Sequence, residues 1–117
     1  LPLSTAWEKP LLFSEFGVGV KQGLAGGTDE IWTEDFGVRF YEDQLAWCDE
    51  LRTAGMLQGL SPWILKDFRS PRRPLGGIQD WYNRKGLISE TGERKRVFDV
   101  VRRQYATWAA EGLQQVP

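Results

Sequence analysis

The chain has 117 residues, a net charge of −1, 41% hydrophobic and 26% charged side chains, a balance typical of one globular domain rather than a disordered chain. It contains no histidine and a single cysteine, Cys48, which excludes histidine-based catalytic triads, histidine metal sites and internal disulfides. No apolar run approaches the ~20 residues that span a membrane, and the first residues lack the basic and apolar regions of a signal peptide. We therefore expect no metal and no cofactor. The compartment stays open, with the cytoplasm favoured over secretion.

Charge is unevenly distributed along the chain. Residues 1–65 carry ten acidic and four basic side chains, whereas residues 66–117 carry six acidic and eleven basic ones. Such an asymmetry indicates either an anionic partner or two solvated faces. The basic residues are scattered and follow no nucleic-acid-binding motif, so we expect neither nucleic acid nor a membrane as a partner.

The first predicted element, after an irregular lead-in, is a buried strand. Pro10 opens the apolar run at residues 11–16, and Gly17 closes it, as is typical of a short strand in a parallel sheet. Glu15 is the anomaly in this run, because a carboxylate seldom lies inside an apolar strand without a reason. Residues 17–31 predict a glycine-rich loop without a phosphate-binding pattern, and a loop of this length is typical of a functional segment.

A helix is predicted over residues 34–53. Thr33 offers a capping hydroxyl, and apolar side chains recur at helical spacing through the segment. These side chains are Tyr41, Leu45, Cys48 and Leu51. Gly55 ends the helix, and residues 56–65 predict a second strand that Pro62 ends or distorts.

The rest of the chain predicts a loop, a helix and a tail. Residues 66–92 are rich in Pro, Gly and Arg and predict a long loop, in which Arg72 and Arg73 are expected to be exposed. A helix is predicted over residues 93–110, with basic side chains facing outward and a frayed tail at 111–117. Its apolar stripe consists of Val97, Val101, Tyr105 and Trp108, with Phe98 beside it. The chain is thus a βα unit repeated, a type of fold that places its chemistry on the loops after the strands.

Three segments carry a pattern that is more specific than their composition. Residues 9–17 read Lys-Pro-Leu-Leu-Phe-Ser-Glu-Phe-Gly, residues 61–68 contain a Trp and an Asp-Phe pair, and residues 83–86 read Asn-Arg-Lys-Gly. In this order they resemble glycoside hydrolase family 2: the strand that carries the nucleophile, the last barrel strand, and the Asn-x-Lys motif by which β-glucuronidases hold the sugar carboxylate. Arg94-Lys95 and the segment after them resemble the closing barrel helix.

The resemblance implies an α/β fold made of the last two βα units of an eight-stranded TIM barrel. Residues 1–110 would be the C-terminal portion of a catalytic domain, and residues 111–117 a tail. The implied activity is that of a retaining β-glycosidase on β-D-glucuronides, with Glu15 as the nucleophile. Trp63 would stack on the sugar ring, and Asn83 and Lys85, which point the same way in an extended loop because of their i, i+2 spacing, would hold the carboxylate.

A retaining glycosidase needs a second carboxyl group about 5–5.5 Å from the nucleophile. In the family this residue follows an Asn, and the chain contains no Asn-Glu pair. The resemblance therefore implies that the acid/base residue lies elsewhere in a larger polypeptide and that this chain alone is inactive. Two βα units cannot close a barrel, so we expect contacts with the remainder of the barrel or with other copies of the chain.

The residues leave several alternatives open. Glu15 is also compatible with a surface salt bridge, Trp63 with a core position, and Asn83 and Lys85 with a solvated turn. At the level of function, the alternatives are a non-catalytic carbohydrate-binding or scaffold fragment, or a β-galacturonidase or β-galactosidase with the same barrel end.

Overall fold

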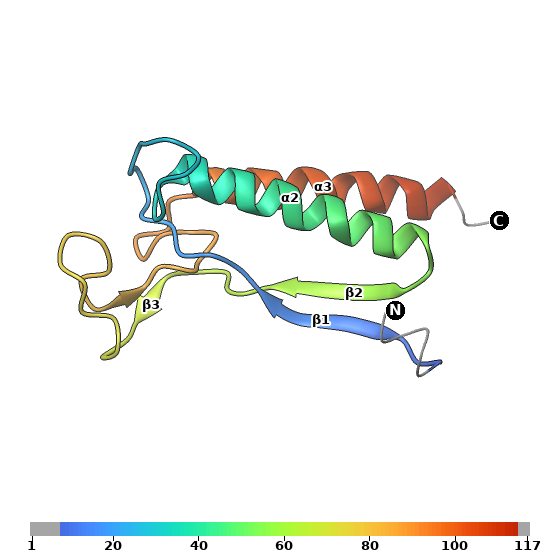
Figure 1. Ribbon diagram of the computed structural model, residues 1–117, viewed down its shortest axis with the longest axis horizontal. Coiled ribbons are helices and arrows are strands. Elements are labelled where there is room, and N and C mark those ends of the chain that lie inside the picture. Colours follow the sequence, from blue (N-terminus) through green and yellow to red (C-terminus); the bar gives the residue numbers. More distant parts are fainter. Residues whose placement is uncertain (1–7, 115–117) are drawn as a thin grey trace.

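The computed structural model describes residues 8–114, in which two helices lie side by side over a pair of parallel strands (Figure 1). The strands β1 (Leu11–Phe16) and β2 (Leu57–Pro62) are joined by the helix α2 (Glu34–Thr53), and the helix α3 (Arg96–Gln114) packs beside α2. A parallel pair of strands requires a long crossover, which α2 provides. The predicted α/β class and the alternation of strands and helices are confirmed.

Helix α2 begins and ends where its capping residues predict. The Thr33 hydroxyl accepts a hydrogen bond from the backbone N–H of Phe36 at 3.1 Å, which satisfies one of the free donors of the first turn. After the last turn, Gly55 has a φ of 76°, a left-handed conformation that glycine adopts without steric cost. The predicted inward side chains Tyr41, Leu45 and Cys48 are buried, and Leu51 is half-buried.

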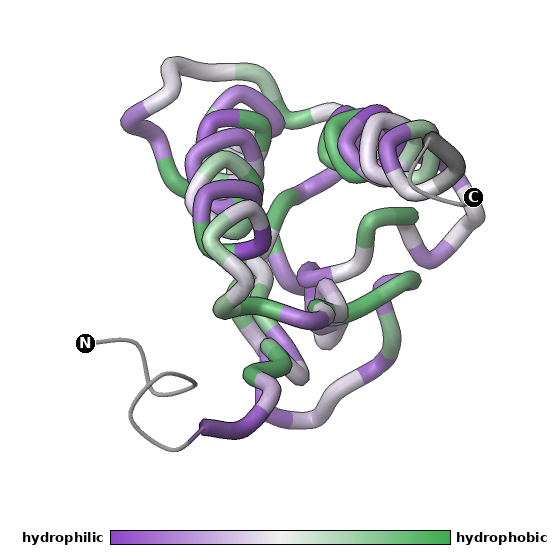
Figure 2. The backbone as a smooth tube through the Cα atoms, turned by 90° about the vertical axis from the view of Figure 1, so that its right-hand side faces the viewer, coloured by the Kyte–Doolittle hydropathy of each residue, from purple (hydrophilic) through white to green (hydrophobic). Residues whose placement is uncertain are grey.

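The core lies between the two helices and the loops that follow the strands. Its buried members are Val20, Tyr41, Leu45, Leu87, Val97, Val100 and Val101. Gly37 permits close packing here, because a Cβ atom at this position would lie 2.4 Å from Cγ2 of Val20 and 2.9 Å from Cγ1 of Val97. Figure 2 looks along the helices and shows them next to each other with the strands beneath. No helix within residues 8–114 is long and apolar enough to cross a membrane.

One predicted boundary and one predicted face are wrong. The second strand ends at Pro62, as that proline predicted, because the chain turns away there to bond with residues 85–88. The last helix starts at Arg96 rather than at 93, because residues 93–95 pair through their backbone with residues 87–89. Tyr105, expected in the apolar stripe, is exposed, and Val100 is buried instead.

The predicted tail is also helical over residues 111–114, whereas residues 115–117 and 1–7 lie outside the described residues. The physical reason is an ion pair between Arg52, at the end of α2, and Glu111, in the last turns of α3. This contact holds the ends of the two helices together.

The segment predicted as a loop over residues 66–92 contains a short hairpin. The strands β3 (Phe68–Arg69) and β4 (Tyr82–Asn83) pair in antiparallel fashion, with Phe68 opposite Asn83 and Arg69 opposite Tyr82. Strands of two residues carry no detectable periodicity, which is why the sequence did not predict them. Figure 1 places this hairpin, residues 68–83, at the end of the molecule toward which β1 and β2 point.

Candidate functional site

Glu15 lies where β1 loses its regular pairing with β2. Phe13 pairs with Leu60 and Phe16 pairs with Pro62, so β1 advances by three residues where β2 advances by two. The extra residue makes this a β-bulge. Bulges re-aim side chains and are common at barrel rims and beside active sites.

The bulge determines the face of the sheet that Glu15 occupies. The ring of Phe13 stacks on Trp47 with 5.4 Å between centroids, and the ring of Phe16 lies 5.8 Å from that of Tyr41, so both point toward α2. Glu15 precedes Phe16, and the alternation of side chains along a strand places it on the opposite face, where it is exposed. Without the extra residue, Glu15 would share the helix-covered face with Phe13.

Trp63 follows β2 directly and lies against the end of β1. Its backbone N–H donates to the carbonyl oxygen of Phe16 at 2.8 Å. A Cβ atom on Gly17 would lie 2.3 Å from the carbonyl oxygen of Trp63, so the close approach of the two segments requires glycine at this position. The indole is half-buried and meets the ring of Phe68 edge-on at 5.6 Å, and the peptide bond that follows Trp63 is cis. Trp63 and Glu15 therefore both lie at the carboxyl end of the two parallel strands.

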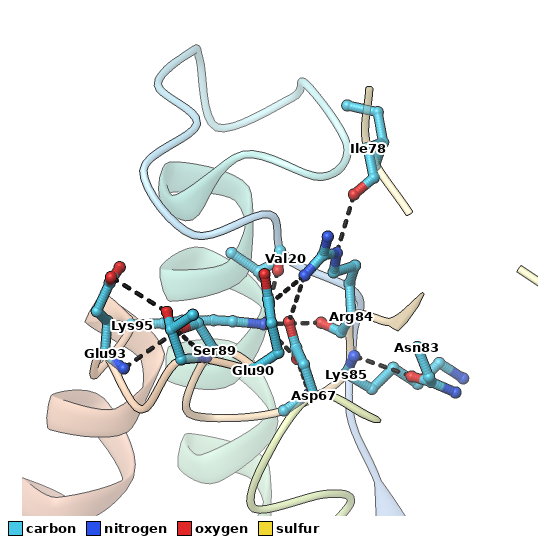
Figure 3. A network of polar contacts seen from close by, with 12 residues as sticks. Val20, Asp67, Ile78, Asn83, Arg84, Lys85, Ser89, Glu90, Glu93 and Lys95 are labelled. Carbon is cyan, nitrogen blue, oxygen red and sulfur yellow. Dashed lines mark hydrogen bonds and ion pairs between the residues drawn. The ribbon is translucent and has the colours of Figure 1, made fainter. Parts of the chain in front are cut away.

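Asn83 and Lys85, at the end of the hairpin, lie near the same end of the parallel strands. The side-chain oxygen of Asn83 accepts a hydrogen bond from the backbone N–H of Lys85 at 3.0 Å, which fixes the local turn. The carbonyl oxygen of Lys85 accepts from the N–H of Ile64 at 2.9 Å, so the loop lies directly beside the Trp63 segment. Figure 3 shows the side chains of Asn83 and Lys85 extending to the same side, as their spacing predicts.

Behind this loop lies an ionic cluster whose central members, Lys95 and Asp67, are fully buried (Figure 3). The ammonium group of Lys95 donates to Oδ1 of Asp67 at 2.8 Å, to the carbonyl oxygen of Val20 at 2.7 Å and to that of Arg84 at 3.0 Å. The side chains of Lys95 and Asp67 both have 0% exposure. Burial lowers the pKa of Lys95, whereas the hydrogen bond to Asp67 acts in the opposite direction.

Arg84 forms the second half of the cluster. Its Nη1 atom donates to Oδ2 of Asp67 at 3.3 Å and to the carboxylate of Glu90, and its Nε atom donates to the carbonyl oxygen of Ile78 at 2.9 Å. The guanidinium also lies 4.9 Å from the ring centroid of Tyr82. Because successive side chains alternate, the buried Arg84 anchors the loop and leaves its neighbours free to point the other way.

Sequence reasoning did not assign a role to this cluster. It expected the basic residues around the start of the last helix to face outward, but Lys95 is completely buried. The sequence did contain one indication of this cluster, namely Asp67, which closely follows an apolar strand. A carboxylate that is buried at such a position requires a cation beside it. Within residues 8–114, no group of three or more His, Cys, Asp or Glu side chains is arranged to hold a metal ion.

The sequence matches no protein-family profile, and a search of the curated proteins finds no match. The fold matches solved structures of sugar-acid glycosidases. With a TM-score of 0.72 and 25% identity, the chain is similar to a glycoside hydrolase family 2 β-galacturonidase from Eisenbergiella tayi bound to galacturonate, over 85% of this chain and 17% of that one. A Bifidobacterium dentium β-glucuronidase complexed with coumarin-3-O-glucuronide gives a TM-score of 0.72 and 27% identity, over 87% of this chain and 16% of that one.

A third match, to the β-glucuronidase of Faecalibacterium prausnitzii, has a TM-score of 0.71 and 24% identity over 88% of this chain and 17% of that one, which supports the fold alone. The chain therefore spans about a sixth of the length of the enzymes that it resembles. These neighbours support a glycosidase-related origin for the chain and leave the roles of individual residues to be proposed.

The buried cluster makes a testable prediction about stability. Replacing Lys95 by Met removes the closer of the two cations that pair with the buried Asp67 carboxylate, and loss of one partner of a buried pair costs about 3–5 kcal/mol of unfolding free energy. Denaturant unfolding measures this change. The matched control is Arg103→Met, at an exposed position on α3, which should change stability by no more than ~0.5 kcal/mol. Equal stability of the two variants would contradict the role given to the cluster.

Proposed function

We propose that the chain is part of a retaining β-glycosidase that cleaves β-D-glucuronides, with residues 1–110 forming the C-terminal portion of its TIM-barrel catalytic domain. The observation that carries the proposal is the bulge in β1. It turns Glu15 onto the open face of the sheet, at the carboxyl end of the strands, where Trp63, Asn83 and Lys85 also lie. In parallel βα folds the carboxyl ends of the strands are where catalytic residues gather. The likeness to sugar-acid glycosidases supports the same assignment.

In this proposal Glu15 attacks the anomeric carbon of the bound sugar while the glycosidic bond breaks, which gives a covalent glycosyl–enzyme intermediate. A second carboxyl group protonates the leaving oxygen and then activates the water that releases the sugar. That second group would come from a part of the enzyme beyond these residues, so the isolated chain should be inactive. A strand end holds a nucleophile more rigidly than a mobile loop, and Glu15 occupies such a position.

The same end of the strands carries the groups that would bind a sugar acid. Lys85 forms no ion pair within the described part of the chain, so its ammonium group is available for a ligand carboxylate. Asn83 would add a directional hydrogen bond through its amide. Trp63 would offer its indole face to the apolar side of the pyranose ring.

A β-galacturonidase is the second candidate. The observation that favours it is the galacturonate bound to the Eisenbergiella tayi enzyme, which the chain matches as closely as it matches a β-glucuronidase. Glucuronate and galacturonate share the carboxylate and differ in the configuration of one ring hydroxyl. Comparing turnover of the two aryl glycosides by the complete protein distinguishes the candidates.

The shape of the chain supports its place in a larger barrel. Its radius of gyration is 16.0 Å, compared with about 13 Å for a compact domain of this length. Its accessible surface of 7578 Å² exceeds the roughly 6,500 Å² expected for a compact monomer of this mass. The apolar side chain of Leu12, on the sheet face away from the helices, is 65% exposed. We propose that the remainder of the barrel, or another copy of the chain, covers this face.

The nucleophile assignment predicts the effect of Glu15→Gln in the complete protein. The amide cannot form the glycosyl intermediate, so hydrolysis of an aryl β-glucuronide should fall by at least about a thousandfold. Steady-state kinetics measures the loss. The control is Glu50→Gln, an exposed position on α2, which should leave turnover unchanged. Unchanged turnover in the Glu15→Gln enzyme would exclude Glu15 as the nucleophile.

The carboxylate assignment predicts a change in substrate preference for Lys85→Met. A charge-assisted hydrogen bond contributes about 1.5–3 kcal/mol, so the ratio of kcat/KM for an aryl β-glucuronide to that for the matching β-glucoside should fall by about tenfold or more. The β-glucoside lacks the carboxylate and serves as the internal control. A parallel loss on both substrates would show that Lys85 supports the structure rather than the recognition of the carboxylate.

A further inference from the structure

One buried carboxylate, that of Asp67, holds the residues on both sides of Lys85. Its Oδ1 atom accepts a hydrogen bond from the backbone N–H of Gly86 at 2.8 Å, and its Oδ2 atom accepts from Nη1 of Arg84 at 3.3 Å. The approach is so close that a Cβ atom on Gly86 would lie 2.2 Å from the backbone nitrogen of Asp67. The chain is therefore fixed immediately before and immediately after Lys85.

Asn83 and Lys85 are supported in different ways. Asn83 belongs to β4 and is paired with Phe68 in the hairpin ladder, whereas Lys85 lies beyond the last pair of that ladder. The residues before and after Lys85 both bond to the buried cluster, and in an extended segment the residue between them faces the other way. Figure 3 shows the Lys85 side chain extending away from the cluster. The direction of this side chain thus depends on Asp67.

Glu90 holds Arg84 in the orientation that this contact requires. Its carboxylate accepts from Nη1 of Arg84, the same atom that donates to Asp67. Burial raises the pKa of Glu90, but its backbone hydrogen bond and the positive charges of Arg84 and Lys21 outweigh burial and hold the pKa below its usual value. Glu90 is therefore ionised at neutral pH and forms a charge-assisted hydrogen bond.

The two carboxylates differ in how readily they can be replaced. The Asp67 side chain has 0% exposure and also pairs with Lys95, so a change there disturbs the buried ion pair itself. The Glu90 side chain keeps 28% of its surface exposed, so its replacement should cost less stability. Glu90 therefore gives access to the support of Lys85 without dismantling the core of the cluster.

We propose that Asp67 and Glu90 are positioning residues that direct the Lys85 ammonium group to the sugar carboxylate. They would thereby determine the preference for a sugar acid over the matching neutral sugar, although neither contacts the substrate. This inference rests on the proposed function, in which Lys85 binds the carboxylate. Because a displacement of about 1 Å in a positioned group can cost as much as a hundredfold in rate, loss of this support should be measurable.

Steady-state kinetics of the complete protein tests the inference with an aryl β-glucuronide and the matching β-glucoside. Glu90→Gln keeps the size of the side chain and an acceptor oxygen but removes the charge, so the ratio of the two kcat/KM values should fall by about threefold or more. The loss should fall on the glucuronide alone. The matched control is Glu93→Gln, because Glu93 is exposed on the same turn and accepts from the Thr91 hydroxyl, and it should leave the ratio unchanged.

Two further variants extend the test. Asp67→Asn should lower the ratio by about tenfold or more if the protein folds, and Glu90→Gln carries the test if it does not. Lys85→Met removes the group that is positioned, so adding Glu90→Gln to it should change the ratio by about 1.5-fold or less. This double variant separates positioning of Lys85 from a general loss of structure.

Three results would overturn the inference. They are an unchanged ratio in the Glu90→Gln protein, an equal loss on both substrates, and an effect of Glu90→Gln that keeps its full size beside Lys85→Met. Failure of the proposed function gives a different result, namely a ratio that Lys85→Met by itself leaves unchanged, and this result would remove the basis of the inference as well.

Discussion

The enclosed contact between Lys95 and Asp67 is the interaction on which the candidate site depends. Neither side chain has exposed surface, so the Lys95 ammonium group requires the Asp67 carboxylate, which Arg84 also contacts, and the remaining donors of the ammonium group require acceptors. Those acceptors are the carbonyl oxygens of Val20 and Arg84. One ammonium group therefore joins the loop after β1, the segment after β2, the loop after the hairpin and the start of α3.

This arrangement separates the buried side chains that support the loop from the side chains that we propose to contact the substrate. Arg84 points inward to Asp67, whereas Asn83 and Lys85 on either side of it extend away from the cluster. The proposed recognition groups thus lie on a loop whose backbone is fixed from behind. The same principle applies to Glu15, because Phe16 beside it is anchored against α2 while the carboxylate faces the open side of the sheet. Rigid support of this kind is what a catalytic carboxylate requires.

The sequence predicted the elements that local chemistry determines. Thr33 and Gly55 mark the ends of α2 through capping and a left-handed turn, and both act at short range. It could not predict the bulge at Glu15, because the bulge exists only in the register between two strands that lie far apart in the sequence. The partner of Asp67 was also hidden, since Lys95 is 28 residues away and looks like any solvated lysine.

Glu15 was predicted from a motif, and the structure places it at the end of β1 on the face of the sheet away from α2, while its role as the nucleophile stays a proposal. The most direct test is to incubate the complete, active protein with a 2-fluoro β-glucuronide carrying a good leaving group, which slows hydrolysis of the glycosyl–enzyme intermediate, and to map the modified peptide by mass spectrometry. The account predicts a single sugar adduct on Glu15. An adduct on a different carboxylate, or turnover that proceeds without any adduct, would contradict it.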